Sequence, residues 1–244
     1  MIAFLKPIFY VPLYNGLIFL IGILPGHSVG VAVILFTFFV KLLLFPFSRK
    51  AAKFQLEMKT HEQEINRIKE QYKNDKQAQG KAILDFYREK KINPFAAILP
   101  LFIQIPIVIS LYYIFYHGGL PAIDMNLVYS FVSVPIPDMH FLGMNMLEKS
   151  LLLAILAGVA QLAQAHFAMP PAPTKTGAPS LGNDLARSMH VQMKYILPVF
   201  MGFVAYAVSS AVALYFITSS LFTIGQEVIV RRSLKKGHRE QRQA

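Results

Sequence analysis

The sequence predicts an all-α integral membrane protein, and three observations lead to that class. Hydrophobic residues make up 55% of the chain, above the roughly 45–50% of an ordinary soluble domain. They are gathered in blocks, several of which reach the roughly 20 residues that carry a helix across the hydrocarbon of a bilayer. Nearly all lysines and arginines lie in three segments that flank these blocks, the charge arrangement of membrane proteins.

The net charge of +11 does not indicate DNA binding, because the basic residues follow the ends of the apolar blocks. The chain has no cysteine, which excludes disulfides and thiolate metal sites. We expect neither a metal nor a cofactor.

Three apolar blocks are long enough to span the membrane as single helices. The second of them ends in Tyr112, Tyr113 and Tyr116, a grouping typical of the aromatic belt at a membrane interface. These three spans are placed over residues 28–47, 94–116 and 151–169.

The last apolar block predicts two short spans. As one helix, residues 195–230 would run to roughly 54 Å, far beyond the membrane. Ser209–Ser210 lies near the middle and can supply a turn, and Lys194 and Arg231 bracket the block with the same charge. We therefore predict a fourth span over 195–208 and a fifth over 211–230. The fourth is too short for an unperturbed bilayer, which implies tilt or local thinning.

The N-terminal segment, residues 1–27, is apolar but interrupted by Pro12, Asn15 and Gly16. A signal peptide is disfavoured, because Pro25–Gly26–His27 forms a turn where a cleavage site would lie. A further span and an interfacial helix both remain open. We favour the interfacial helix, because so few residues would connect two spans.

The basic residues set the orientation. Residues 48–93 and the tail, 231–244, hold dense sets of lysine and arginine, whereas the loop over 117–150 holds only Lys149. Five spans then place the N-terminus and residues 117–150 outside, and 48–93, the loop over 170–194 and the tail in the cytoplasm. Without a recognisable organellar presequence, we expect a bacterial plasma membrane.

Residues 48–93 predict a cytoplasmic antiparallel helical hairpin. Asn74–Asp75 marks its turn, and Phe86 and Tyr87 lie on the apolar side of the second helix. A solvated connector without a partner is the alternative. The first helix carries an apolar seam spaced by four and three residues: Phe54, Met58, His61, Ile65, Ile68 and Tyr72.

Lys41 is a charge inside the first span. It lies eight residues before Arg49, hence roughly 12 Å deep along a helix. It is either a lysine that reaches back to the interface or a functional group, since intramembrane charge is costly. Thr37 lies one turn away on the same face, and other spans also carry polar residues, which predicts a shared hydrated cavity. Taken singly, each glutamine could instead join two helices. The polar residues of the other spans are Gln104, Gln161, Gln164, Thr218, Ser219 and Gln226.

Several motifs occur in a fixed order. They are Lys41-Leu42-Leu43-Leu44-Phe45-Pro46, Tyr72-Lys73-Asn74-Asp75-Lys76, Asn93-Pro94 leading into Leu99-Pro100-Leu101-Phe102-Ile103-Gln104-Ile105-Pro106 and Leu111-Tyr112-Tyr113, and Leu214-Tyr215-Phe216 with Gln226. The ordered set resembles the YidC/Oxa/Alb family of membrane protein insertases over residues 28–230 or so.

The resemblance implies five core spans, a cytoplasmic hairpin, and a hydrophilic groove open to the cytoplasm and the lipid but closed outside. The family's groove charge is typically arginine where this chain has Lys41. The family also usually has tryptophan at Phe216, and often asparagine at Ser220. The candidate groove residues are Thr37, Lys41, Gln104, Gln161, Gln164, Phe216, Ser220 and Gln226.

The expected function is insertion of newly made membrane proteins into the bilayer without nucleotide hydrolysis. The implied partners are nascent membrane proteins and lipid, with the ribosome and the Sec translocon as further candidates. A secondary transporter or channel is the alternative, although the first four spans hold no Asp or Glu to couple ions. We expect no catalytic residues, because insertion makes or breaks no bond.

Overall fold

The computed structural model describes residues 6–117, 119–169, 188 and 190–243. The chain forms two compact units, one of Met1–Leu43 with Gln104–Glu227 and one of Leu44–Ile103 with Val228–Ala244. The predicted loop over 170–194 lies largely outside the described residues.

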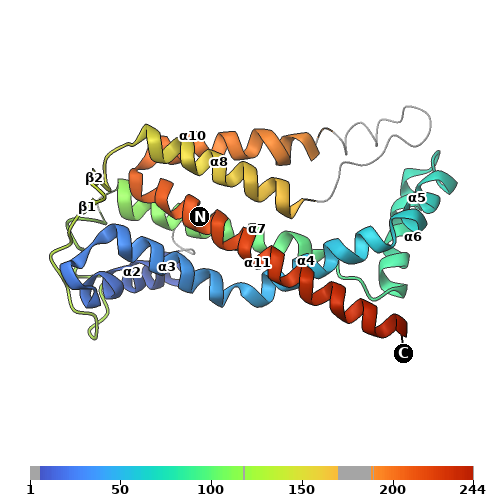
Figure 1. Cartoon of the computed structure of the whole chain (residues 1–244), viewed down its shortest axis with the longest axis horizontal. Coiled ribbons are helices and arrows are strands. Elements are labelled where there is room, and N and C mark those ends of the chain that lie inside the picture. The colour runs from blue at the N-terminus through green and yellow to red at the C-terminus, as the bar shows by residue number, and fades with distance from the viewer. Residues whose placement is uncertain (1–5, 118, 170–187, 189, 244) are drawn as a thin grey trace. The chain divides into compact units, whose positions relative to one another are not determined.

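Helices dominate the described chain (Figure 1). The first unit contains η1 (Lys6–Tyr10), α2 (Val11–Ile23), η2 (Pro25–His27), α3 (Val29–Leu43), β1 (His140–Phe141), β2 (Met144–Asn145), α8 (Leu151–Ala168), η3 (Gln192–Ile196) and α10 (Leu197–Val208). The second contains α4 (Phe45–Thr60), α5 (Glu62–Gln71) and α6 (Lys76–Glu89), whereas α7 (Phe95–Tyr116) and α11 (Ser210–Gln243) contribute to both.

The segment between α7 and α8 connects the ends of helices in the first unit. The Val29 N–H donates to the Asp138 carbonyl over 2.9 Å at the start of α3. The Ser210 N–H donates to the Glu148 carbonyl over 2.7 Å at the start of α11. These bonds satisfy helix-terminal donors that have no partner within their own helix. Because α3 and α11 both begin at this segment, they run away from it in the same direction.

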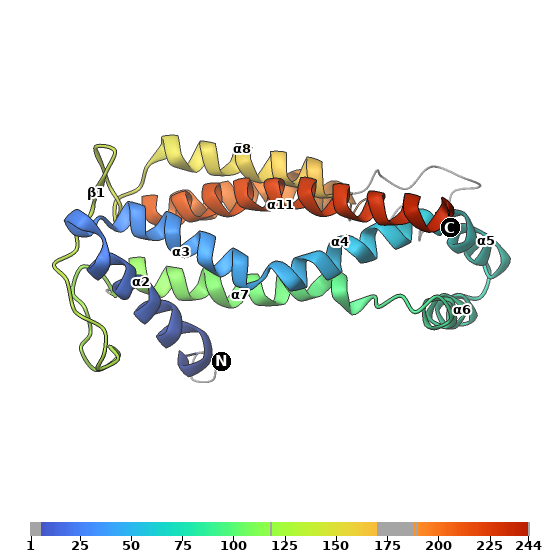
Figure 2. The ribbon, with the colours of Figure 1, turned by 60° about the horizontal axis from the view of Figure 1, so that its bottom comes forward.

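The same segment is bonded to the middle of α2. The buried Tyr14 hydroxyl donates to the Gly119 carbonyl over 2.9 Å and accepts from the Asp124 N–H over 2.9 Å. The Asn15 amide donates to the Leu127 carbonyl over 2.7 Å. Asn15, which interrupts an apolar run in the sequence, is therefore satisfied by a neighbouring loop. Figure 2 shows α2 running obliquely to α3 from their shared turn.

Small residues let α8 and α10 approach closely, and Figure 1 shows the two helices side by side. A Cβ placed on Gly202 would lie 3.2 Å from the Gly158 Cα. Close contact of this kind drives helix association in lipid, where the hydrophobic effect does not act between helices. Ser209 has extended backbone (φ −169°, ψ 165°) and separates α10 from α11.

The outward faces of these helices are apolar. Ile155 and Val159 on α8 are 55% and 57% exposed, and Phe203 on α10 is 66% exposed. Apolar surface of this extent is expected where lipid, not water, covers the helix.

Length and composition identify three helices that can cross a membrane among the described residues: Lys6–Ile23, Leu151–Ala168 and Ser210–Val230. Two further apolar stretches, Phe102–Tyr116 and Gln192–Val208, are shorter. These apolar helices confirm the predicted all-α membrane class.

The predicted first span, residues 28–47, contains a break. The helix α3 ends at Leu43, α4 begins at Phe45, and only the two together pass the same length and composition test. Pro46 explains the break, because its ring is tolerated in the first turn of a helix but would remove a hydrogen bond from a continuing one. The predicted fifth span, residues 211–230, coincides with the membrane-length stretch Ser210–Val230, and the helix α11 itself continues to Gln243.

In the second unit, α5 and α6 pack against each other. Their small core consists of Ile65, Phe86 and Ile92. The Asp75 carboxylate caps α6 by accepting from the Gln77 and Ala78 N–H groups over 3.0 and 2.9 Å. The apolar seam expected along one helix is shared between α4 and α5, which are separated at His61.

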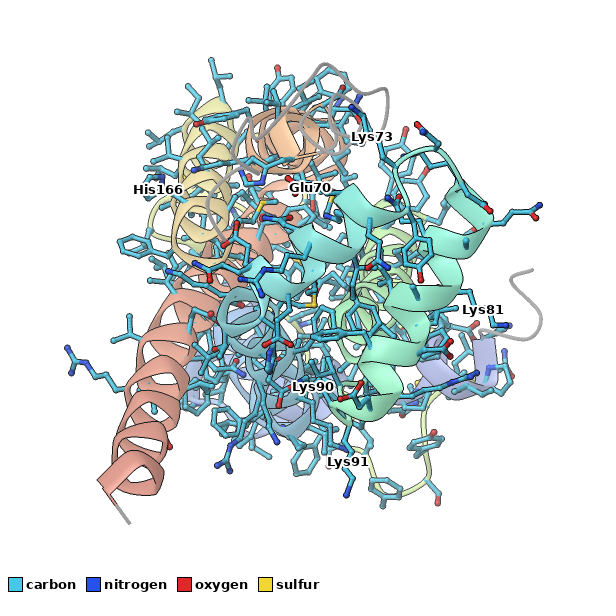
Figure 3. The ribbon with its side chains drawn as sticks, turned by 90° about the vertical axis from the view of Figure 1, so that its right-hand side faces the viewer. Glu70, Lys73, Lys81, Lys90, Lys91 and His166 are labelled. Atoms are coloured by element: carbon cyan, nitrogen blue, oxygen red, sulfur yellow. The ribbon has the colours of Figure 1, made fainter. Side chains whose placement is uncertain are left out.

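The charged side chains of this unit lie outside its core. Figure 3 shows Lys81 and Lys91 extending away from the ribbon, and both are exposed. An ion pair joins Lys90 to Glu64 over 3.3 Å, linking the end of α6 to the start of α5.

Candidate functional site

The polar face of α3 carries Thr37 and Lys41. Thr37 is fully buried, and its hydroxyl donates to the Val33 carbonyl over 2.6 Å, which satisfies it within its own helix. Lys41 follows one turn later and is partly buried. Among the described residues it forms neither an ion pair nor a hydrogen bond. A cation in an apolar helix thus has no neutralising partner within this part of the chain.

A hydrogen bond between side chains joins α7 to α11. The Gln104 amide donates to the Tyr215 hydroxyl over 2.6 Å. Tyr215 is 1% exposed, and the neighbouring Phe216 is 2% exposed. A buried tyrosine needs a partner for its hydroxyl, so this contact fixes which faces of the two helices meet. It places Gln104, a predicted site residue, against α11.

An aromatic contact joins α3 to α11. The rings of Phe38 and Phe222 meet edge to face, with centroids 5.2 Å apart. Lys41 lies three residues after Phe38, and Gln226 lies four residues after Phe222. Since the two helices run in the same direction, one further turn places Lys41 and Gln226 on the adjoining sides of neighbouring helices.

Two buried polar atoms of α11 have no hydrogen-bond partner among the described residues. They are the Ser220 hydroxyl and the Gln226 amide nitrogen, on side chains that are 0% and 6% exposed. An unsatisfied buried polar group costs about 1–3 kcal/mol. Their presence on the helix that adjoins Lys41 and Gln104 is expected of a surface that receives water or a polar ligand.

The structure does not bring Gln161 and Gln164 into this group. Both are partly buried on α8, which packs mainly against α10 and η3. No hydrogen bond between described residues connects either glutamine to the side chains on α3, α7 or α11. The candidate site in the structure therefore consists of Thr37, Lys41, Gln104, Tyr215, Phe216, Ser220 and Gln226.

Tyr215 is the site residue that sequence reasoning missed. It belongs to the motif Leu214-Tyr215-Phe216. A tyrosine within an apolar span was the available signal, because its hydroxyl must be satisfied inside the membrane. Among the described residues, no three His, Asp or Glu side chains gather as a metal site would require.

Comparison with known proteins gives consistent matches. The family described as 60Kd inner membrane protein matches residues 20–238. Proteins named membrane protein insertase YidC from Francisella tularensis subsp. novicida, tularensis and holarctica are each 30% identical over 212 residues. Each alignment covers 86% of this chain and 34% of the relative, so the chain spans about a third of the length of the relatives it matches.

Proposed function

Because the chain belongs to the 60Kd inner membrane protein family, the YidC/Oxa/Alb family, we propose that it is an insertase for newly made membrane proteins. The single observation that carries the proposal beyond family membership is the polar surface on α3, α7 and α11. Lys41 and two unsatisfied polar atoms lie on adjoining helices, α3 and α11. A simple membrane anchor gains nothing from such a surface, whereas the passage of a polar segment requires one.

We propose a topology of five spans with the N-terminus outside and the C-terminus in the cytoplasm. The extended backbone at Ser209 supports two separate last spans. The hydrogen bonds of Tyr14 and Asn15 to residues 119–127 support an α2 that lies along the external segment. The α5–α6 pair, with its outward lysines, then forms a cytoplasmic hairpin.

The proposed mechanism is electrostatic capture followed by hydrophobic release. Lys41 attracts the acidic tail of a substrate into a hydrated groove lined by Gln104, Ser220 and Gln226. The substrate helix then partitions into lipid, which yields about 25 cal/mol per Å² of apolar area. No bond is formed or broken, so no nucleotide needs to be hydrolysed.

A short fourth span would help by thinning the bilayer. The stretch Gln192–Val208 is 17 residues long, so as a helix it reaches roughly 26 Å. The hydrocarbon core is about 30 Å thick. The bilayer can thin locally to match the shorter helix, at a cost of fractions of a kcal/mol per Å of difference in length. A thinner bilayer shortens the apolar path that the substrate tail must cross.

The test is reconstitution of the purified chain into liposomes that lack the Sec translocon, with a newly made single-span substrate carrying an acidic N-terminal tail. Protease protection of the tail measures insertion. We expect Lys41→Ala to reduce the protected fraction several-fold, Lys41→Arg to retain it, and the exposed lysine control Lys59→Ala to leave it unchanged.

Equal insertion by all three variants would remove Lys41 from the mechanism. Ion or solute flux in the same liposomes, without any effect on tail protection, would instead support a transporter or channel. Protection only when the Sec translocon is added would make that translocon an obligate partner.

A further inference from the structure

A cavity of about 290 Å³ lies in the first unit, away from Lys41 and its polar neighbours. Its walls come from η1, α7 and the segment that follows α7. Tyr10, Ser110 and Tyr113 contribute polar and aromatic surface, and Ile109 and Leu127 contribute apolar surface. The remaining lining residues, Lys6 and Asp124, carry opposite charges.

Lys6 and Asp124 face the same space but do not form an ion pair with each other among the described residues. The position of Asp124 is fixed, because its N–H donates to the buried Tyr14 hydroxyl over 2.9 Å. One carboxylate oxygen accepts from the Asn126 N–H over 3.0 Å. Lys6 and Asp124 are both exposed and line one cavity, and two opposite charges that face one space are complementary to a ligand that carries both charges.

Aromatic rings line the space between the charges. The rings of Tyr10 and Tyr113 meet edge to face with centroids 6.3 Å apart, and Tyr10 stacks on Tyr14 at 5.7 Å. Tyrosine faces attract cations through the ring quadrupole. An ammonium group beside Asp124 would therefore meet both a carboxylate and aromatic faces.

The surroundings favour a lipid over a free solute. Tyr112, Tyr113 and Tyr116 gather at this end of α7, as aromatic residues do at a membrane interface. Ile109 and Leu127 provide an apolar wall for the glycerol and first acyl carbons. We propose that the cavity binds the phosphoethanolamine headgroup of a lipid, with the phosphate at Lys6 and the primary ammonium at Asp124 and the tyrosine rings. This site is independent of the insertase function.

The experiment measures binding of short-chain phosphatidylethanolamine to the full chain in detergent by titration calorimetry. Phosphatidylcholine has a trimethylated ammonium that cannot donate a hydrogen bond to Asp124, and phosphatidylglycerol has no ammonium. We expect phosphatidylethanolamine to bind about tenfold more tightly than either, since a charge-assisted hydrogen bond is the difference. Soluble phosphoethanolamine, which lacks the glycerol and acyl groups, should bind more weakly than the lipid.

Asp124→Asn keeps the backbone N–H bond and an acceptor oxygen, so it should fold while losing about tenfold in affinity for phosphatidylethanolamine. Lys6→Gln should lose a similar factor. Asp138→Asn is the matched control, because Asp138 accepts from the His140 N–H over 2.9 Å on the same segment but does not line the cavity. Its affinity should equal that of the unmodified chain.

Equal affinity for the three lipids, or unchanged affinity in both Asp124→Asn and Lys6→Gln, would overturn the proposal. Soluble phosphoethanolamine binding as tightly as the lipid would overturn the assignment to a lipid. A failure to insert substrate in the liposome assay would not contradict the proposal of lipid binding, because the two measurements concern different residues and ligands.

Discussion

Gln104 and Tyr215 show what a polar pair contributes inside the membrane. Their hydrogen bond, 2.6 Å long, connects α7 to α11. Tyr215 is 1% exposed, so its hydroxyl depends on partners within the protein. The pair therefore stabilises one arrangement of α7 against α11, the helix that also carries Ser220 and Gln226.

Removing one member of the pair should therefore destabilise the fold. We expect Tyr215→Phe to cost about 0.6–1.7 kcal/mol, the range of interhelical hydrogen bonds in membranes. Gln104→Leu should cost a similar amount, and the double variant should cost less than the sum. Thermal unfolding in detergent measures this, with Tyr112→Phe as a control on the same helix α7. Additive effects would show that the two side chains are not coupled.

The break between α3 and α4 could not be read from hydropathy, because residues on both sides of Leu44 are apolar. Pro46 is compatible both with the end of one helix and with the first turn of the next. Helical spacing alone places Thr37 and Lys41 one turn apart, and both lie on α3. The separation of Gln161 and Gln164 from them depends on the packing of α8 against α10, which helical spacing does not specify.

Because α8 and α10 pack closely, the loss of stability caused by an added methyl group should depend on which glycine receives it. A methyl group on Gly202 would lie 3.2 Å from the Gly158 Cα, whereas one on Gly158 would lie 3.8 Å from its nearest neighbour. Gly202→Ala should therefore lower the midpoint of thermal unfolding more than Gly158→Ala. Gly225→Ala, with nothing within 4 Å, is the control and should not lower it. Equal effects at the first two positions would contradict the packing.

The α5–α6 pair should respond to acid through Glu64. A hydrogen bond from His61, followed by the contact with Lys90, holds the pKa of this carboxyl below its usual range. A depressed pKa stabilises the packed pair above the unfolded pKa of about 4.3, and the contribution is lost as pH falls through the folded pKa. Glu64→Gln should therefore flatten the acid end of the stability profile, while the exposed Glu62→Gln should not.

The acid response of Glu64 can be followed by the fluorescence of a tryptophan introduced into the α5–α6 core. The chain has no tryptophan, so Tyr87→Trp reports on the α5–α6 core alone. Its emission should shift on acidification in the otherwise unmodified chain and less in the Glu64→Gln background. An identical shift in both would show that another group controls the response.

The proposed whole-molecule topology rests on the distribution of basic residues. Residues 48–93 and 231–244 hold dense sets of lysine and arginine, whereas residues 117–150 hold a single lysine. The class and the membership of the chain in its family could be predicted from sequence. The number of spans could not, because η1 and α2 together reach the length of a span and yet bond through Tyr14 and Asn15 to residues 119–127.

Cysteine labelling tests this topology, since the chain has no native cysteine. Ile136 is 91% exposed in the segment after α7, and Leu84 is 52% exposed on α6. An impermeant maleimide added to intact cells or spheroplasts should label Ile136→Cys at once. It should label Leu84→Cys only after the membrane is permeabilised. The opposite pattern would invert the proposed orientation.

The central claim is that the positive charge of Lys41 selects the tail of a substrate. The most direct measurement compares insertion of two substrates that differ only in tail charge, one acidic and one basic, by the unmodified chain and by Lys41→Glu in Sec-free liposomes. The unmodified chain should protect the acidic tail better, and Lys41→Glu should reverse that preference, because like charges repel strongly in a medium of low dielectric constant. An unchanged preference for the acidic tail in Lys41→Glu would contradict the account.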